Sequence, residues 1–440
     1  MKLFTILILI LLSCEHAFNQ QPYSLEDCFN AAKENNIGLQ RSQHDIESSY
    51  IDKQAAIFNL LPAVSVNAEH IFSSGKNIDP VTNNFVRDNF SGGDFNMTVE
   101  LNIFSGFSAL NAIKSSLYKI KAEEYAYQKN EMNIFFSITA AYAKVMYDRE
   151  QVSTIRNNNQ HTREELNVVQ EEIDVGKLSK SDYYTINTRY KTEQADLVDI
   201  QNDSLTAINQ LKYLIGLHYN TAFDIKDIDS TEIKSIVTKD FTLSEVLDTV
   251  LKNYPALLES MFEERSAEMN VKSAKGNLFP TLSFAGNIFS NYNSLDRNLS
   301  SDHISFGQQL NNNFGKTVGF VLQVPLFNKY QNRFAIEKEK INLSNAKLAT
   351  QQIENDIAKN VQQLLNDFFS AKQKYLLEKE SLQQGQLAYE AFEERHKLGY
   401  ISSLELILAK DQLYTQQVKT IQAKYNLYFK YKLIEELLVY

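Results

Sequence analysis

The sequence predicts an α+β protein built from two copies of one unit, in which long helices alternate with short strands. Over residues 95–103, five apolar side chains alternate strictly with polar ones, which is the period of a strand with one apolar face. From Leu110 the apolar spacing changes to three and four, the period of a helix, and no proline interrupts it before Gly176. The same order of features returns in the second half of the chain.

The two copies align residue by residue. Pro62, after two leucines, matches Pro280, after Leu-Phe, at an offset of 218 residues. The turn at Gly176 matches the turn at Gly399 at an offset of 223, so the second copy gains five residues in between. We expect a first repeat over residues 23–219, a linker over residues 220–240 and a second repeat over residues 241–440.

Residues 1–19 are expected to be a signal peptide. Lys2 precedes a mostly apolar run over residues 3–12, which is too short to span a bilayer. Two cleavage sites remain open. Leu-Leu-Ser before Cys14 fits a bacterial lipoprotein site, and lipidation of Cys14 would anchor the amino terminus in a membrane. Ordinary cleavage at residues 17–20 would instead remove Cys14. No other stretch reaches 18 apolar residues, so no membrane-spanning helix is expected.

The composition argues against a nucleic-acid-binding protein and favours one with long helices. With 44 Lys and Arg against 54 Asp and Glu, the net charge of −10 argues against nucleic acid as a partner. Only 14 Gly and 6 Pro occur in 440 residues, which fits long uninterrupted helices. Cys28 is the only cysteine outside the leader, so we expect no internal disulfide and interpret Cys28 as a small apolar residue on a helix.

Each repeat begins with a capped helix. Ser24 and Thr242 are the expected N-caps, with Asp27 and Glu245 three residues on as capping-box carboxylates. Because Glu or Gln is usual at that position, the Asp27 copy is the weaker match. We expect breaks in these helices at residues 36–38 and 254–255.

Prolines end these helical stretches. Pro62 and Pro280 block continuation of the helix and bias the preceding residue to extended structure. Strand pairs with polar loops between them are expected next. The expected strands cover residues 64–68, 95–104, 282–284 and 318–327, and the expected loops cover residues 73–93 and 291–313.

Long helices are expected to run to Gly176 and Gly399 and to return over residues 181–217 and 403–440. About 70 helical residues would span roughly 100 Å, against a mean helix length of about 11–12 residues. Apolar residues of the last helix form a coiled-coil-like seam.

Four strands with an apolar outer face are too few to close a barrel, which needs about eight. Strands that face lipid cannot leave open edges. The chain must therefore associate with itself if it enters a bilayer, and three copies would supply twelve strands, an even number consistent with outer-membrane barrels. The alternative is a soluble antiparallel sheet with one buried face.

With these features in order, residues 23–440 resemble the TolC-like outer-membrane channel family. The motifs that carry the resemblance are the joints at Pro62 and Pro280, the Val-Pro-Leu-Phe motif at residues 324–327, and the turns at Gly176 and Gly399 followed by Ser179 and Ser402. Residues 74–83 look like the first external loop of Bacteroidetes-type members.

The resemblance implies a homotrimer, with a twelve-stranded barrel in the outer membrane and a helical barrel across the periplasm. It implies a passive exit duct of a tripartite efflux or type I secretion system that docks onto a periplasmic adaptor and an inner-membrane pump. From the residues themselves, no cofactor and no metal are expected. The residues expected at the docking tips are Gly176, Leu178, Ser179, Gly399, Ile401 and Ser402.

The resemblance also implies an acidic constriction at the entrance, six positions past the second tip glycine. Glu405 stands there, and Asp182 holds the equivalent position in the first repeat. Leu408 replaces a further acidic residue of the family, and Asn102 replaces the usual proline before the first joint. For both acids the alternative is a plain role in the first turn of a helix, where acids favour the helix dipole.

No residue pattern supports an enzyme. The seven histidines are scattered, and the sequence has no metal-ligand spacing, nucleophile elbow, phosphate loop or dinucleotide motif. Two classes of function remain: a transport channel, and a secreted coiled-coil scaffold or surface lipoprotein without channel activity.

Overall fold

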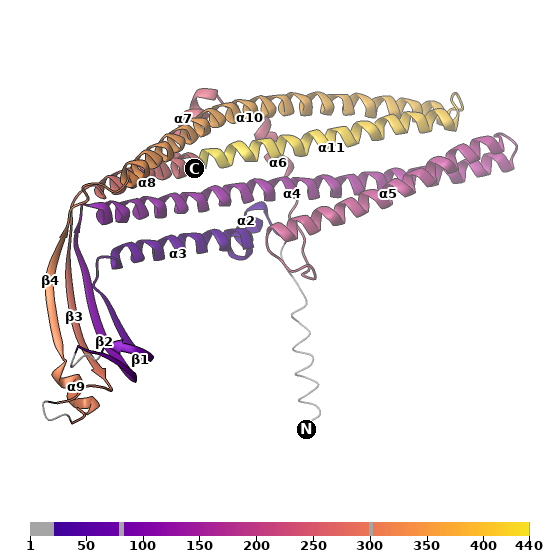
Figure 1. Ribbon diagram of the computed structural model, residues 1–440. Coiled ribbons are helices and arrows are strands. Elements are labelled where there is room, and N and C mark those ends of the chain that lie inside the picture. The colour runs from indigo at the N-terminus through magenta and orange to yellow at the C-terminus, as the bar shows by residue number, and fades with distance from the viewer. Residues whose placement is uncertain (1–21, 79–82, 299–301, 440) are drawn as a thin grey trace, which may run out of the picture. The chain divides into compact units, whose positions relative to one another are not determined.

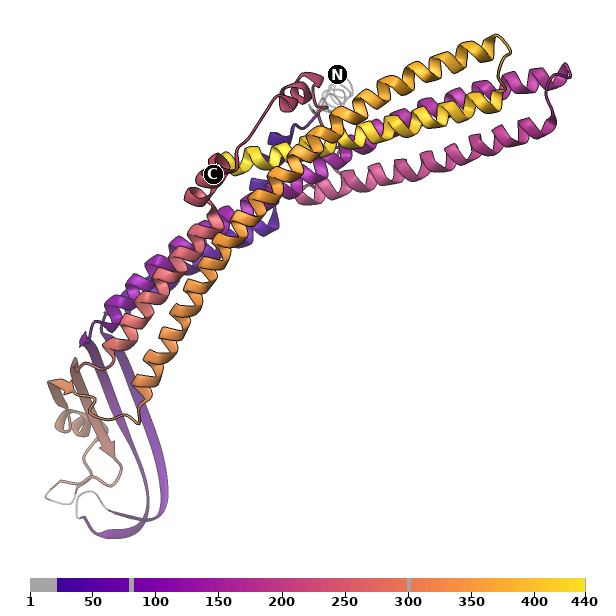
Figure 2. The same ribbon diagram turned by 90° about the horizontal axis from the view of Figure 1, so that it is seen from above.

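The computed structural model describes residues 22–78, 83–298 and 302–439. The expected signal peptide and Cys14 lie outside these residues, as do residues 79–82 of the expected external loop. The described chain is mostly helical and has one four-stranded antiparallel sheet (Figures 1 and 2). None of its helices combines the length and the apolar character needed to cross a bilayer.

The helices of the two repeats correspond in length and position. Three pairs match: α2 (Leu25–Asn35) with α7 (Leu243–Asn253), α3 (Ile37–Phe58) with α8 (Pro255–Gly276), and α4 (Ser108–Asp174) with α10 (Gln331–Lys397). Their lengths are 11, 22 and 67 residues in both copies. The return helices are α5 (Lys180–Leu214) and α11 (Ser403–Val439). The predicted duplication is therefore confirmed.

The first helix of each repeat is capped at the predicted residue, but the two caps differ from the expected order. The amide of Ser24 donates to Asp27 Oδ2 at 2.9 Å and the amide of Asp27 donates to Ser24 Oγ at 3.1 Å, which completes the reciprocal box. At Thr242 the hydroxyl accepts from the amide of Glu245, but the carboxylate of Glu245 binds the hydroxyl instead of the Thr242 amide. The Asp27 copy therefore forms the complete box and the Glu245 copy only half of it, the reverse of the order expected from the usual Glu or Gln at that position.

The sheet has the strand order β1-β2-β3-β4, with every neighbouring pair antiparallel. The strands are β1 (Ala63–Ile78), β2 (Phe85–Ser105), β3 (Thr281–Asn293) and β4 (Gly315–Gln323). All four strands meet helices at the same end of the sheet (Figure 1).

Several expected strand boundaries were wrong. The polar stretch expected as a loop over residues 73–93 is mostly strand, because β1 and β2 stay paired as a two-stranded ribbon out to Ile78 and Phe85. Backbone pairing satisfies the amide and carbonyl groups there whatever the polarity of the side chains. β4 ends at Gln323 instead of Phe327, since Pro325 has no amide hydrogen for the ladder. Residues 291–313 hold the end of β3 and a short helix, α9 (Phe306–Asn312).

The stretch expected as a linker, residues 220–240, has structure of its own. It contains α6 (Ser230–Val237), and Ile225 forms a parallel bridge with Tyr23 at the start of the chain. The hydroxyl of Tyr142 on α4 donates to the carbonyl of Lys226 at 2.6 Å. The linker is therefore fixed to the helices at several points.

The chain forms two compact units, and each unit takes segments from both repeats. The helical unit consists of residues 22–43, 126–257 and 353–439, and the sheet unit consists of residues 44–125 and 258–352. In the helical unit, one core surrounds Phe368 and Leu427, and a second surrounds Cys28 and Leu211. Cys28 is fully buried, as expected of a small apolar residue, and burial raises the pKa of its thiol to about 12.

Candidate functional site

The first hairpin end joins α4 to α5 in the helical unit. Gly176 has a φ of +78°, the left-handed conformation that ends many helices. The amide of Gly176 donates to the carbonyl of Ile173 at 2.9 Å, and the amide of Lys177 donates to that of Glu172 at 2.8 Å. These bonds close a Schellman-type C-cap at the predicted glycine.

The second hairpin end joins α10 to α11 and repeats this geometry. Gly399 has a φ of +76°, its amide donates to the carbonyl of His396, and the amide of Tyr400 donates to that of Arg395, both at 2.9 Å. Both turns therefore lie at the residues that the sequence pattern indicated.

Asp182 and Glu405 are the acidic partners of two more capping boxes. The amide of Ser402 donates to Glu405 Oε2 at 2.9 Å, and the amide of Glu405 donates to Ser402 Oγ at 3.3 Å. The pair Ser179 and Asp182 forms the same two bonds. Bonds from the backbone and side chain of Ser402 lower the pKa of Glu405. The helix-terminus role that the sequence left open is thus observed for both acids.

The remaining predicted tip residues differ in exposure. Leu178 is half-buried and packs against a small core of Val169, Ile186 and Ile407, and Ile401 is buried. The apolar side chains that lie open at the hairpin ends are Val175, Leu398 and Tyr400, with exposed fractions of 70%, 67% and 74%. These three residues were not predicted from the sequence, although each is adjacent to a tip glycine and could have been found from that position.

A buried polar network links α4, α5 and α11 away from the hairpin ends. Lys410 Nζ donates to the carbonyl of Asn158 at 2.7 Å and to Thr162 Oγ1 at 2.6 Å. The Thr162 hydroxyl lies 3.0 Å from Glu193 Oε1, and Glu193 is 2% exposed. Burial lowers the pKa of Lys410 to about 8 and raises the pKa of Glu193.

Arg189 extends this network between α5 and α11. Its guanidinium lies 2.6 Å from Asp411 Oδ1 and 3.3 Å from Glu193 Oε1. No sequence motif signals these contacts, because the partners come from three helices that are far apart in the chain.

The sheet unit presents two chemically different faces. The strand register places mainly apolar side chains on one face and polar ones on the other. The apolar face carries Val64, Val66, Phe72, Phe95, Met97, Val99, Leu101, Phe284, Ile288, Val318, Phe320 and Leu322. The polar face carries Ser65, Asn67, Glu69, Asp94, Asn96, Thr98, Glu100, Ser283, Asn287, Asn291 and Thr317. This alternation confirms the predicted two-faced strands.

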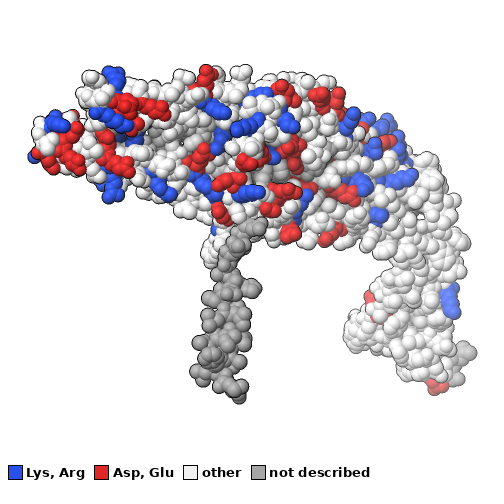
Figure 3. Space-filling model, turned by 180° about the vertical axis from the view of Figure 1, so that it is seen from behind, with Lys and Arg blue, Asp and Glu red and all other residues white. Residues whose placement is uncertain are grey.

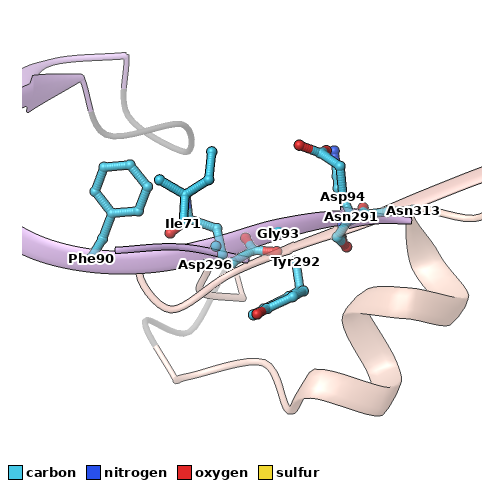
Figure 4. A pocket seen from close by; sticks show the side chains of 10 residues that line it. Ile71, Phe90, Gly93, Asp94, Asn291, Tyr292, Asp296 and Asn313 are labelled. Carbon is cyan, nitrogen blue, oxygen red and sulfur yellow. Dashed lines mark hydrogen bonds between the residues drawn. The ribbon is translucent and has the colours of Figure 1, made fainter. Parts of the chain in front are cut away.

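Figure 4 shows both faces near the end of the sheet that lies away from the helices. Asp94 and Asn291 point to one side of the strands, and Tyr292 points to the other side, toward α9. A cavity of about 380 Å³ lies beside these three residues and is lined also by Asp296 and Asn313. Within the described residues, no group of three or more His, Cys, Asp or Glu side chains could hold a metal ion.

Comparison with known proteins agrees with this geometry. The family model for outer membrane efflux proteins matches residues 29–217 and 246–438, which correspond to the two repeats. The chain therefore belongs to the outer membrane efflux protein family. Membership locates it in the cell outer membrane and confirms that it is not an enzyme, because the proteins of this family are channels.

Individual relatives are distant in sequence but similar over most of their length. The chain is 19% identical to the outer membrane efflux protein BepC of Brucella suis biovar 1 (strain 1330), over 90% of this chain and 80% of BepC. It is 19% identical to the outer membrane protein TolC of Escherichia coli (strain K12), over 97% of this chain and 84% of TolC.

Solved structures share the fold. CusC, whose crystal structures concern folding and transmembrane channel formation, superimposes with a TM-score of 0.79 at 14% identity, over 94% of this chain and 91% of CusC. The CmeC outer membrane channel of Campylobacter jejuni gives a TM-score of 0.77 at 16% identity, over 94% and 85% of the two chains. The predicted fold class, with long helical hairpins joined to a four-stranded sheet, is confirmed.

Proposed function

We propose that this chain forms a homotrimeric channel in the outer membrane that serves as the passive exit duct of a tripartite efflux or type I secretion system. The observation that carries the proposal is the two-faced, four-stranded sheet joined to long helical hairpins in a member of the efflux protein family. Two of the relatives named above are efflux or channel proteins by their own descriptions.

The height of the apolar face supports insertion in an outer membrane. On β1 the face runs from Val64 to Phe72, and His70, its one polar member, pairs with the hydroxyl of Tyr292. Nine residues at about 3.3 Å each extend roughly 30 Å, and a tilt of about 40° reduces this to roughly 23 Å. The apolar band of outer-membrane barrels is about 25 Å tall.

The distribution of charge supports the same environment. On the side of the molecule shown in Figure 3, acidic and basic side chains crowd the helices, whereas the sheet is almost free of them. Charged groups are costly in contact with hydrocarbon and favourable in water, so the sheet fits lipid and the helices fit the periplasm.

Two features support association with further copies of the chain. The strand order leaves one edge of β1 and one edge of β4 unpaired within the chain, and lipid-facing edges must be closed. On α10, Phe334, Ile341 and Leu348 are at least 60% exposed and lie seven residues apart. Apolar residues at this heptad spacing pack against a facing helix in coiled coils, and we propose that a second copy of the chain supplies that helix.

The hairpin ends are the proposed docking surface for a periplasmic adaptor and, through it, an inner-membrane pump. The exposed Val175, Leu398 and Tyr400 would supply apolar contact area. The predicted tip residues would shape the turns beneath them: Gly176, Leu178, Ser179, Gly399, Ile401 and Ser402. Asp182 and Glu405 are the proposed entrance constriction, since each cap uses one carboxylate oxygen and leaves the other available.

Planar-bilayer recording tests the channel and its constriction. Asp182→Asn and Glu405→Gln remove charge and keep an oxygen for the cap, whereas Glu171→Ala removes an exposed acid on α4 as a matched control. We expect discrete conductance steps, a weaker block by divalent cations in the double variant, and no change in the control. Absence of conductance from purified oligomer would contradict the duct, and unchanged block would contradict the constriction alone.

A further inference from the structure

The strand residues that line the cavity of about 380 Å³ are arranged around Gly92, which lies on the polar face of the sheet. In the register, Ile71 of β1 and Asn293 of β3 are the cross-strand neighbours of Gly92. Phe90 and Asp94 are the next residues of β2 on the same face, one on each side of Gly92. Because Gly92 has no side chain, an open space remains between these four residues.

Phe90 gives the cavity an aromatic wall. A Cβ built on Gly92 would lie 3.7 Å from Cε2 of the Phe90 ring, so the ring borders the space above Gly92. Ile71 lines the cavity from the same side of the strands as Phe90 (Figure 4). Together, Phe90 and Ile71 offer an apolar surface on which the C–H face of a ring-shaped ligand can pack.

Three polar side chains of the cavity are available to a ligand. Within the described part of the chain, no hydrogen bond or ion pair engages the side chains of Asp94, Asn291 or Asp296. Backbone bonds fix two of these residues in place. Asn313 Nδ2 donates to the carbonyl of Asn291 at 3.0 Å, and the carbonyl of Asp296 accepts from the amide of Ile304 at 3.2 Å.

The charge of the lining limits the chemistry of the ligand. Asp94 and Asp296 are the acidic residues of the lining, and no Lys, Arg or His lines the cavity. Two carboxylates without a neighbouring cation repel an anion. The described residues also offer no group of three or more His, Cys, Asp or Glu side chains that could hold a metal ion. The ligand that fits is therefore a hydroxyl-rich ring without negative charge.

We propose that this cavity binds a sugar ring without negative charge, either neutral or carrying an amino group. One C–H face of the sugar packs on Phe90 and Ile71. Its hydroxyl groups donate to the carboxylates of Asp94 and Asp296 in charge-assisted hydrogen bonds, and an ammonium group strengthens binding through the same carboxylates. The volume lies in the lower part of the range of about 300–1,000 Å³ for small-molecule sites, which favours a short saccharide. Binding of the sugar does not depend on the proposed duct.

Ligand-observed NMR titration of the detergent-purified, full-length oligomer tests the proposal. The detergent must carry no sugar headgroup, because such a headgroup would compete for the cavity. The probes are glucosamine, glucose and glucuronic acid, which are positive, neutral and negative at neutral pH. We expect glucosamine to bind most tightly and glucuronic acid most weakly. Equal binding of methyl glucosaminide would show that the cavity accepts the terminal sugar of a glycan, whereas its loss would restrict the cavity to free sugars.

Two variants test the groups that carry the proposal. Asp94→Ala should weaken glucosamine binding by at least about tenfold, the effect of a lost charged hydrogen bond, and should reduce the preference for glucosamine over glucose. Phe90→Leu keeps an apolar side chain without the ring and should weaken glucosamine and glucose alike, by about threefold to tenfold. The matched control is Glu100→Ala. Glu100 is an exposed acid on the same face of β2, roughly 20 Å along the strand from Asp94 and outside the cavity, so the control should bind as the parent does.

Three outcomes would overturn the proposal. The first is unchanged glucosamine binding by both variants, and the second is equal weakening by the control. The third is displacement of glucosamine by ethanolamine at equal concentration, which would indicate a simple cation site. Conducting trimers that bind no sugar would refute this inference alone, whereas an oligomer that binds glucosamine and never conducts would refute the proposed duct and support this inference.

Discussion

Single residues decide how closely the strands and rings of the sheet approach one another. Gly93 lies opposite Tyr292 in the register, and a Cβ built on Gly93 would lie 2.1 Å from the carbonyl oxygen of Glu69 and 2.7 Å from the Tyr292 ring. The ring of Tyr292 therefore uses the space that a side chain on Gly93 would fill. Tyr292 in turn contacts Phe306 on α9, so this glycine determines how α9 sits on the sheet.

Substituting Gly93→Ala should lower the stability of the sheet by about 1–3 kcal/mol, the usual cost of overpacking. Gly319→Ala on β4 is the matched control, because a Cβ there meets nothing within 4 Å. Thermal unfolding of the purified protein in detergent would measure both. A loss in Gly319→Ala as large as that in Gly93→Ala would show that close approach is not the cause.

At the scale of helices, the network around Lys410 fixes α11 against α4 and α5. Lys410 compensates the buried carboxylate of Glu193 through Thr162. Replacing Lys410→Met keeps the length of the side chain and removes one of the two cations near Glu193, whose carboxylate keeps Arg189 at 3.3 Å. Loss of one partner of a buried pair costs about 3–5 kcal/mol.

Because Arg189 remains beside Glu193, we expect Lys410→Met to lower the free energy of unfolding by at most that amount, measured by chemical denaturation. The double variant Lys410→Met with Glu193→Gln should recover part of the loss, because the uncompensated charge is removed. Strictly additive losses in the double variant would contradict the coupling of these two groups.

Glu436 near the end of α11 makes stability depend on pH. Burial, and then the neighbouring Glu131, raise its pKa from 4.5 to about 6. Because the folded state binds the proton more tightly than the unfolded state, the stabilisation is complete below pH 4.5 and is lost as the pH rises through 6.

Replacing Glu436→Gln should accordingly stabilise the protein by about 1–2 kcal/mol above pH 6, and the difference should vanish below pH 4.5. Melting temperatures of both proteins at about pH 4 and at about pH 7.5 would show this difference. A gain that is the same at both values would mean that Glu436 acts through packing and not through its charge.

Residues that begin or end helices made much of the fold predictable from the sequence. Pro62, Gly176 and Ser179 each act within a few residues of their own position, so their effect does not depend on distant neighbours. The partner of Lys410 could not be predicted, because it depends on which helices lie side by side. The extension of β1 to Ile78 also depends on a distant partner. Pairing with β2 holds these polar residues in a strand, although their composition is typical of a loop.

At the scale of the whole molecule, a single chain is incomplete. The sheet has two unpaired edges, and α10 carries exposed apolar residues at heptad spacing. In the proposed trimer, β1 of one copy would pair with β4 of the next, which would close both edges. Closure of the sheet by three copies is therefore the central claim.

Cross-linking between the two edge strands tests this claim most directly. Val66→Cys on β1 and Val318→Cys on β4 lie on the same face of the sheet, and the native Cys28 is buried and out of reach. A short bismaleimide added to the double variant in outer membranes should give covalent dimers and trimers, while either single variant should give none. A double variant that stays monomeric, or that forms ladders beyond the trimer, would contradict a closed three-chain barrel.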